Sequence, residues 1–124
     1  MRVLLVDDEK ELVSALAERL EMRGIETRWF TTGKAALEAS RTECFDLAVL
    51  DVKMPGMGGL ELKNILKQRC PQMKFIFLTA YGSEQVFDSV TTDIGYDFYL
   101  VKPIDINELM AKIKALSGEP EGDP

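Results

Sequence analysis

The sequence predicts an α/β fold built on one parallel sheet, with five strands and five helices in alternation. Five short apolar runs recur along the 124 residues, each bounded by turn or polar residues, as the buried strands of a parallel sheet are. Segments with the apolar spacing of helices separate these runs. Short connections and right-handed crossovers then favour a doubly wound sheet with helices on both faces.

The first unit begins with the apolar residues 3–6 (VLLV), which predict a strand. Leucines at positions 12, 16 and 20 share one face of a helix predicted over residues 10–22, and Gly24 stands where a glycine ends such a helix. Thr31 and Thr32 can cap the second helix. The later predicted strands cover residues 25–30, 47–50, 75–78 and 98–101, and the later predicted helices cover residues 34–41, 60–69 and 83–91, with a last helix opened by Asp105.

The third strand leads into the most informative stretch, FDLAVLDVKMPGMGG at residues 45–59. Its apolar run stops at Asp51, and a loop with one proline and three glycines follows. A flavodoxin-like strand order, 2-1-3-4-5, places the first and third strands side by side where such sheets bind ligands. Asp51 then lies at the mouth of a crevice, although Asp alone is also a common turn residue.

Composition and charge exclude several classes of protein. Apolar residues make up 46% and charged residues 29% of the chain, as in ordinary globular domains. A net charge of −6 argues against a nucleic-acid surface. No apolar run reaches the roughly 18 residues of a membrane span, and the N-terminus does not resemble a signal peptide. The chain has no histidine, so histidine chemistry within it is excluded.

The two cysteines, Cys44 and Cys70, lack the spacing of a metal site. Together with the lack of an export signal, this favours two reduced thiols in a cytoplasmic protein. We therefore expect no disulfide.

Polar residues stand at the ends of four predicted strands: Asp7 and Asp8 after the first, Asp51 after the third, Thr79 after the fourth and Lys102 after the fifth. Each one alone is also explained as a helix cap or a surface turn. In a parallel sheet, however, all of these ends lie at one edge. Their joint placement predicts a functional site there.

The chemistry of this set indicates phosphoryl transfer. Three neighbouring carboxylates repel one another and favour a bound cation, and hard oxygen ligands suit Mg²⁺. Lys102 adds a compact positive charge that can reach a phosphate oxygen, and Thr79 adds a hydroxyl. Asp51 is the candidate nucleophile, since a carboxylate can form an aspartyl phosphate.

Four motifs carry a close resemblance to a known family: VDDE, LDVKMPGMGG, LTAYGS and YLVKP. The chain resembles the receiver domain of bacterial two-component response regulators over residues 1–117, which leaves residues 118–124 as an acidic Gly/Pro tail or linker. The sequences of the last two motifs look most like those of receivers of sigma-54-dependent activators or hybrid kinases. The resemblance implies a phosphorylation-dependent switch rather than an enzyme.

The resemblance also implies roles for individual residues. Asp51 accepts a phosphoryl group from a histidine kinase or a phosphotransfer protein, with Asp7 and Asp8 as Mg²⁺ ligands. The backbone carbonyl of Lys53 is implied as a further ligand. Thr79 and Lys102 match the hydroxyl and the lysine that contact the phosphoryl group.

Two further roles concern switching and turnover. Tyr99 matches the aromatic residue that switches the face of the fourth helix, the fifth strand and the fifth helix, through which an output domain, a partner or a second copy is controlled. Lys53 and Tyr81, two residues after Asp51 and Thr79, are expected to set the dephosphorylation rate. Gly58 stands where the family commonly has Asp, and Gly95 is followed by a tyrosine instead of alanine, so the chain departs from the family pattern in the loop after Asp51 and before the fifth strand.

Three other functions remain open from the residues. An aspartyl-phosphate hydrolase would place a second acid two residues after the nucleophile, where this chain has Lys53. An FMN-binding protein would need a phosphate loop after the first strand, where Asp7 and Asp8 repel phosphate. A receiver-like scaffold that is never phosphorylated would not need its acids. The chain either acts alone as a relay or adaptor, or is the N-terminal piece of a longer regulator.

Overall fold

The computed structural model describes residues 1–80 and 99–117. Within these residues, strands and helices alternate as predicted up to residue 80, and a strand and a helix follow residue 98. The elements are β1 (Arg2–Val6), α1 (Lys10–Met22), β2 (Glu26–Phe30), α2 (Gly33–Ala39), β3 (Leu47–Asp51), α3 (Gly59–Arg69), β4 (Lys74–Thr79), β5 (Tyr99–Val101) and α5 (Ile106–Ser117).

The five strands form one parallel sheet in the order β2-β1-β3-β4-β5. This confirms the doubly wound α/β fold and its strand order. In the register of the sheet, Val6 pairs with Leu50, and Asp51 pairs with Leu78. The carboxyl ends of β1, β3 and β4 are therefore level with one another.

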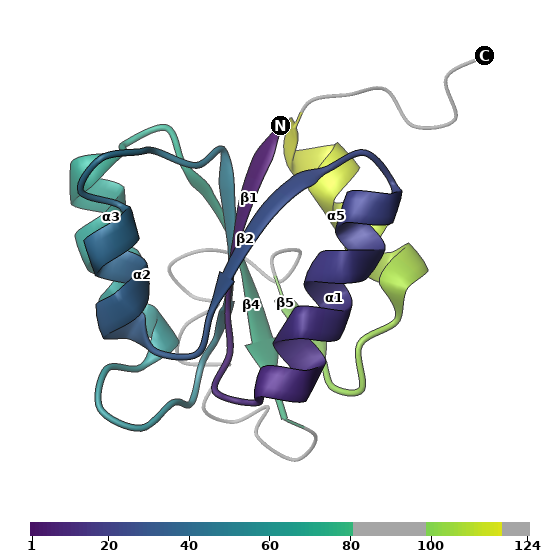
Figure 1. Ribbon diagram of the computed structural model, residues 1–124, viewed down its shortest axis with the longest axis horizontal. Coiled ribbons are helices and arrows are strands. Elements are labelled where there is room, and N and C mark those ends of the chain that lie inside the picture. The colour runs from purple at the N-terminus through teal and green to yellow at the C-terminus, as the bar shows by residue number, and fades with distance from the viewer. Residues whose placement is uncertain (81–98, 118–124) are drawn as a thin grey trace.

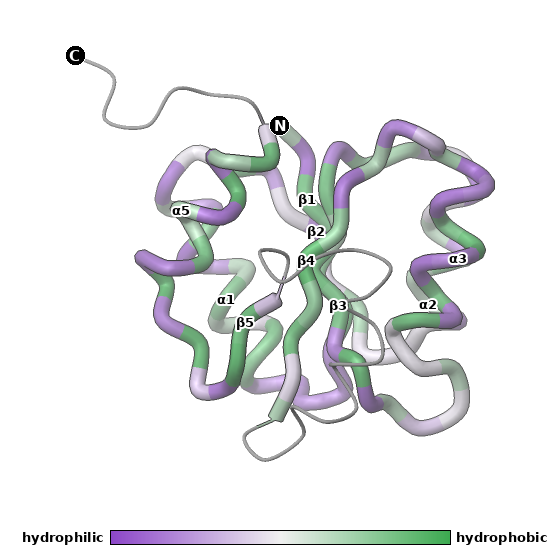
Figure 2. Tube along the Cα trace, turned by 180° about the vertical axis from the view of Figure 1, so that it is seen from behind, coloured by the Kyte–Doolittle hydropathy of each residue, from purple (hydrophilic) through white to green (hydrophobic). Residues whose placement is uncertain are grey.

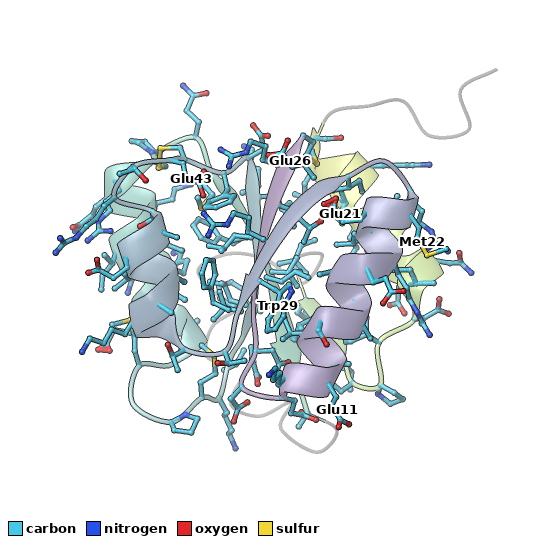
Figure 3. All side chains as sticks on the ribbon, viewed as in Figure 1. Glu11, Glu21, Met22, Glu26, Trp29 and Glu43 are labelled. Carbon is cyan, nitrogen blue, oxygen red and sulfur yellow. A yellow bond between two sulfur atoms is a disulfide. The ribbon has the colours of Figure 1, made fainter. Side chains whose placement is uncertain are left out.

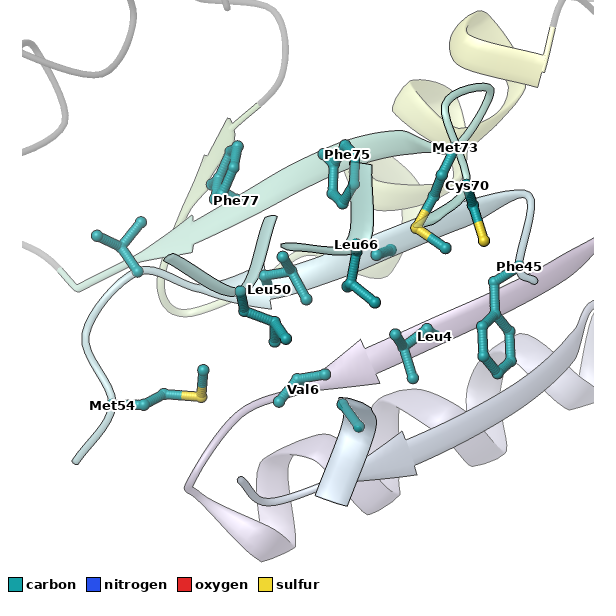
Figure 4. Packing of buried hydrophobic residues seen from close by; sticks show 14 residues of the cluster. Leu4, Val6, Phe45, Leu50, Met54, Leu66, Cys70, Met73, Phe75 and Phe77 are labelled. Carbon is teal, nitrogen blue, oxygen red and sulfur yellow. The ribbon is translucent and has the colours of Figure 1, made fainter. Parts of the chain in front are cut away.

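Helices cover both faces of the sheet: α1 and α5 lie on one face, and α2 and α3 lie on the other (Figure 1). Each face has its own buried apolar cluster, and alternate residues of one strand serve different clusters. In β1, Leu4 and Val6 pack toward α2 and α3 (Figure 4), while Val3 and Leu5 pack toward α1 and α5. Because both faces are covered, the central strands are apolar along their length (Figure 2).

The helix ends follow from local chemistry. Thr32 caps α2, because its hydroxyl accepts a hydrogen bond from the Ala35 N–H at 3.1 Å. Asp105 caps α5, because its Oδ1 accepts a hydrogen bond from the Asn107 N–H at 2.8 Å. Gly24, with φ of 82°, follows α1 in the left-handed region that suits glycine. The α2 helix ends at Ala39, two residues before its predicted end.

The expectation of two reduced thiols is wrong, because Cys44 and Cys70 form a disulfide. The two residues are 26 positions apart, but their Cα atoms lie 6.1 Å from each other, within the usual range for a disulfide. Cys44 lies shortly before β3, and Cys70 follows the last residue of α3. Antiparallel packing of a helix on its preceding strand returns the chain to the same end of the sheet, which spacing alone does not reveal.

Several predictions concern residues outside the described ranges: the helix over residues 83–91, Tyr81, and the tail at residues 118–124. In the part of the chain that the structure describes, no helix is long and apolar enough to span a membrane.

Candidate functional site

The carboxyl edge of the sheet collects the polar residues that the sequence singled out. Asp7 follows β1 and is fully buried, while Asp51 and Thr79, the last residues of β3 and β4, are almost fully buried. Asp8 is exposed. Burying three polar side chains in a sheet core is costly unless each has partners, so this edge is built for interactions rather than for packing.

The three acids form one cluster. A carboxylate oxygen from each of Asp7, Asp8 and Asp51 lies within 4.8 Å of the others. Asp7 is oriented locally, since its Oδ1 accepts a hydrogen bond from the Glu9 N–H at 2.9 Å. The Oδ2 of Asp7 is buried and has no hydrogen-bond partner among the described residues. Three converging carboxylates, one with a buried oxygen that accepts no hydrogen bond, form a suitable oxygen set for a hard divalent cation.

Lys102 neutralises part of this charge. Its Nζ lies 2.8 Å from Asp7 Oδ2, 2.8 Å from Glu9 Oε1 and 3.3 Å from Asp51 Oδ2. The contact with Asp7 is an ion pair that lacks the geometry of a hydrogen bond. Burial lowers the pKa of Lys102, but the carboxylates of Asp7, Glu9 and Asp51 outweigh burial and raise it above its usual value. The ammonium therefore remains charged.

Asp51 has an unusually high affinity for a proton. Burial first, and then the negative charge of Asp7, raises the pKa of Asp51 from 3.8 to about 6, although Lys102 opposes this rise. The carboxylate is still mostly ionised at neutral pH, but its charge is poorly compensated by the protein alone. A cation beside it would supply the missing compensation.

The loop after Asp51 is held close to the strand. An added Cβ on Gly59 would lie 2.2 Å from the Asp51 carbonyl oxygen, so the first residue of α3 must be glycine. The Lys53 N–H lies 3.3 Å from Asp51 Oδ1 and donates to it. The structure thus places Lys53 beside the acid, while the role of its carbonyl as a metal ligand stays a prediction.

Thr79 and Tyr99 lie on the two strands beyond β3. The Thr79 hydroxyl contacts the Ala80 carbonyl at the long distance of 3.5 Å, which makes a weak hydrogen bond. The Lys102 N–H donates to the Thr79 carbonyl at 2.8 Å and joins the two strand ends. Tyr99 pairs with Phe77 in the sheet and is partly buried against the apolar cluster on the α2 and α3 face.

The sequence was compared with known protein families, curated proteins and solved structures. The chain matches the response regulator receiver domain over residues 3–114. It belongs to the response regulator receiver family. A receiver is a phosphoacceptor domain of two-component signalling and is not an enzyme, so the hydrolase alternative is removed. The family implies a histidine kinase as its partner.

Curated receivers of similar sequence are parts of longer regulators. The chain is 37% identical to the response regulator protein PmrA of Pseudomonas aeruginosa over 123 residues, which cover 98% of this chain and 55% of that protein. It is 41% identical to the transcriptional regulatory protein CpxR of Escherichia coli over 116 residues, which cover 93% of this chain and 48% of that protein. The chain thus spans about half the length of these relatives.

These relatives correct the finer expectation from the sequence. The curated relatives are OmpR-family transcriptional regulators, not sigma-54-dependent activators or hybrid kinases. The expectation was wrong because the described residues of the quoted motifs lie at the acid cluster and the neighbouring strand ends. That chemistry is common to receivers and carries little information about the output.

Solved receivers share this fold. The receiver is 35% identical to the response regulator TrrA of Thermotoga maritima, solved in complex with Mg²⁺ and BeF, with a TM-score of 0.79 and coverage of 93% of this chain and 97% of that one. A CheY-like receiver of Methanospirillum hungatei is 34% identical, with a TM-score of 0.82 and coverage of 94% of both chains.

Sequence reasoning missed one residue of the site, Glu9. Its carboxylate contacts Lys102 even though its side chain is 61% exposed. The signal was present, because Glu9 directly follows the acid pair in the VDDE motif. It was missed because Glu9 lies beyond the end of the strand, at the N-cap of α1, where its side chain makes no capping hydrogen bond.

Proposed function

We propose that this receiver accepts a phosphoryl group on Asp51 from a histidine kinase or a phosphotransfer protein, with Mg²⁺, and thereby switches an output. The single observation that carries the proposal is the convergence of Asp7, Asp8 and Asp51 within 4.8 Å, with Lys102 bridging two of them. This arrangement combines a nucleophile, a cation site and a positive charge at one point.

Asp51 is suited to act as the nucleophile. An ionised Oδ attacks the phosphorus of the donor, the bond between phosphorus and the donor nitrogen breaks, and an acyl phosphate forms on Asp51. The pKa of about 6 leaves Asp51 ionised at neutral pH. Mg²⁺ bound by Asp7, Asp8 and Asp51, with the Lys53 carbonyl as a further ligand, would compensate charge on the phosphoryl oxygens.

Lys102 and Thr79 then stabilise the product. The Lys102 ammonium already lies 3.3 Å from Asp51 Oδ2, so a small movement away from Glu9 brings it to a phosphoryl oxygen. The Thr79 hydroxyl exchanges its weak contact with Ala80 for another phosphoryl oxygen. Both contacts are stronger with an anionic acceptor than the contacts they replace.

The output follows from the movement of Thr79. Moving its hydroxyl toward the phosphoryl group vacates space beside β4, into which Tyr99 on the neighbouring strand turns. This remodels the face that includes β5 and α5, and a partner, a second copy or an output domain responds. The names of the curated relatives suggest that this output is control of transcription. We place the receiver at residues 1–117 and a linker at residues 118–124.

The test uses a small phosphodonor, so that no cognate kinase is needed. Phosphoramidate and Mg²⁺ should add one acid-stable, hydroxylamine-labile phosphoryl group to the wild type and none to Asp51→Asn. Wild-type labelling of Asp51→Asn would contradict the assignment. No labelling of the wild type with bound Mg²⁺ would instead support the scaffold that is never phosphorylated.

A second measurement tests the residues expected to set turnover. Lys53 and Tyr81 should flank the solvent side of the phosphoryl group, where long side chains hinder or orient the attacking water. Replacing both by alanine should change the half-life of the phosphorylated protein with little change in Mg²⁺ affinity. An unchanged half-life would remove this role.

A further inference from the structure

The disulfide lies at the end of the sheet opposite the acid cluster. Cys44 precedes the first residue of β3, whereas Asp51 is its last; a strand of this length spans roughly 15 Å. The Cys70 N–H donates to the Leu66 carbonyl at the end of α3. The phosphoacceptor proposal therefore does not use this disulfide, and the disulfide needs an explanation of its own.

A pocket of about 540 Å³ opens beside the disulfide and is lined by residues of the segment 40–44 together with Arg69 and Cys70. This volume lies within the roughly 300–1,000 Å³ of small-molecule sites. Two arginines, Arg41 and Arg69, contribute to its lining. The pocket therefore combines a disulfide with cationic groups.

The one acid in the pocket lining, Glu43, is already neutralised from the sheet side. Its two carboxylate oxygens form ion pairs with Arg2 and Arg28, and Glu43 lies at the same end of the molecule as Glu26 (Figure 3). The Arg2 and Arg28 guanidiniums lower the pKa of Glu43. The Glu43 carboxylate therefore stays ionised and paired with both arginines. The net charge that the lining presents to a ligand is positive.

The two arginines of the lining are available to an anion. Arg69 donates through Nη1 to the Leu37 carbonyl at 2.9 Å and to Ser40 Oγ at 2.7 Å, which fixes the guanidinium at the pocket. A guanidinium has five N–H donors. Among the described residues, the hydrogen bonds of Arg69 use Nη1 alone, so its other N–H groups can donate to a ligand. Among the described residues, the Arg41 side chain forms one ion pair, a 3.6 Å contact with Glu38, and both side chains are largely exposed. Such a pair is weak.

The two cysteines of the disulfide differ in exposure. Cys44 is exposed, whereas Cys70 is 6% exposed. Cys70 belongs to the buried cluster that includes Phe45 and Met73 (Figure 4). Both cysteines line the pocket, and we expect a thiolate that enters it to attack the sulfur of the more exposed residue, Cys44.

We propose that this pocket is a thiol–disulfide exchange site for a small thiol that carries carboxylates. The thiolate attacks Cys44 Sγ, a mixed disulfide forms there, the Cys44–Cys70 bond breaks, and Cys70 leaves as a thiolate that takes up a proton. A second thiol of the same class attacks the mixed disulfide, releases the oxidised small disulfide and leaves Cys44 reduced. The arginines bind the carboxylates and raise the local concentration of the thiol.

The test measures how fast small thiols open the disulfide of the oxidised protein. The probes are 3-mercaptopropionate, 2-mercaptoethanol and cysteamine, which are similar in size and are anionic, neutral and cationic. Each rate constant is divided by that of the same thiol with bis(2-hydroxyethyl) disulfide, because thiol acidity alone changes the rate. At low salt, the normalised rate for 3-mercaptopropionate should exceed the normalised rate for cysteamine by about tenfold. At high salt, the two normalised rates should become similar, because salt screens the charges.

Variants then assign the preference to the pocket. Arg41→Gln and Arg69→Gln should each reduce the normalised preference for the anion several-fold, while Arg69→Lys should retain most of it. The matched control is Arg19→Gln, which removes the same charge from an exposed position on α1 and should leave the preference unchanged. Trapping and peptide mapping should place the mixed disulfide on Cys44.

The proposal is overturned by any of three results: equal normalised rates for the three thiols, an adduct on Cys70 in place of Cys44, or a loss of preference in Arg19→Gln equal to that in Arg69→Gln. None of these measurements involves phosphorylation. Their outcome is therefore independent of the function proposed for Asp51.

Discussion

The Lys102 ammonium lies 2.8 Å from a carboxylate oxygen of Glu9, which is 93 residues away along the chain. The same nitrogen contacts Asp7 and Asp51. Lys102 is thus shared between two buried acids and an exposed one. In the function proposed above, Lys102 gives up at least one of these contacts to reach a phosphoryl oxygen, and the contact with the exposed Glu9 is the least costly to lose.

The first prediction concerns Glu9. Replacing it by glutamine should speed phosphorylation of the receiver by phosphoramidate about two- to fivefold at saturating Mg²⁺, since an exposed charge pair is worth about 1 kcal/mol or less. The free energy of unfolding should change little for the same reason. Glu11→Gln, in the first turn of α1, is the matched control and should leave the rate unchanged. Equal rates in Glu9→Gln and wild type would show that the Glu9 contact does not restrain Lys102.

The second prediction concerns the cation. Mg²⁺ should raise the melting temperature of the wild type, because a ligand that binds only the folded state stabilises it by mass action. Asp8→Ala should remove most of this rise, and because Asp8 is exposed, the variant should still fold. Thermal unfolding with and without Mg²⁺ measures both effects. If Mg²⁺ stabilises Asp8→Ala as much as wild type, the cation binds elsewhere.

The third prediction concerns pH. The pKa of Asp51 is about 6 in the folded protein against an ordinary value of 3.8, so the folded state binds more protons between these values. The free energy of unfolding contributed by this group therefore falls as pH rises from about 4 to 6 and stays low above that. Without metal, Asp51→Asn should become more stable than wild type by on the order of 2 kcal/mol at pH 7, with a much smaller margin at pH 4.

Saturating Mg²⁺ provides the control for this pH effect. The cation compensates the Asp51 charge in wild type, so the advantage of Asp51→Asn at pH 7 should disappear or reverse. Chemical denaturation at pH 4 and pH 7, in EDTA and in Mg²⁺, measures the difference in the free energy of unfolding between Asp51→Asn and wild type under these four conditions. A margin in EDTA that is the same at pH 4 and pH 7 would show that the proton affinity of Asp51 is not raised by the fold.

The fourth prediction concerns the turn that holds the acid. Gly59→Ala would place a Cβ 2.2 Å from the Asp51 carbonyl oxygen, so the backbone must shift, at a cost of about 1–3 kcal/mol or more, and Mg²⁺ affinity should fall with it. Gly33→Ala is the control, because its Cβ would meet only the flexible Met57 side chain, at 3.1 Å, and should cost less. Equal losses of stability in the two variants would contradict the importance of this close approach.

The fifth prediction concerns the switch. Beryllofluoride with Mg²⁺ should mimic the phosphoryl group, and the NMR signals of Tyr99 and of α5 should shift together with those of Asp7, Asp8 and Asp51. Thr79→Ala should keep the shifts at the acids but lose those at Tyr99, because the hydroxyl couples the two. Shifts confined to the acids in wild type would leave a phosphate carrier without a switch.

The sequence by itself determined the fold and the residues of the acid cluster. Apolar runs define strands because both faces of a parallel sheet are buried, and parallel strands bring their carboxyl ends to one edge. The apolar runs can be recognised locally in the sequence, and the common edge follows from the parallel order of the strands. Asp7, Asp51 and Lys102 could therefore be predicted to lie at one edge from the sequence alone. The structure brought them within ion-pair distance through the register of β1, β3 and β5.

Only the tertiary structure decided the partners that depend on distances across the fold. The disulfide joins residues 26 positions apart, and the spacing of Cys44 and Cys70 does not show that the fold brings them together. Glu9 contacts Lys102 because the lysine side chain extends from the end of β5, which β3 and β4 separate from β1 in the sheet, to the acids at the ends of β3 and β1. The raised pKa of Asp51 likewise follows from burial and from the nearby Asp7. These properties depend on how closely separate segments approach each other, which packing of the whole chain decides.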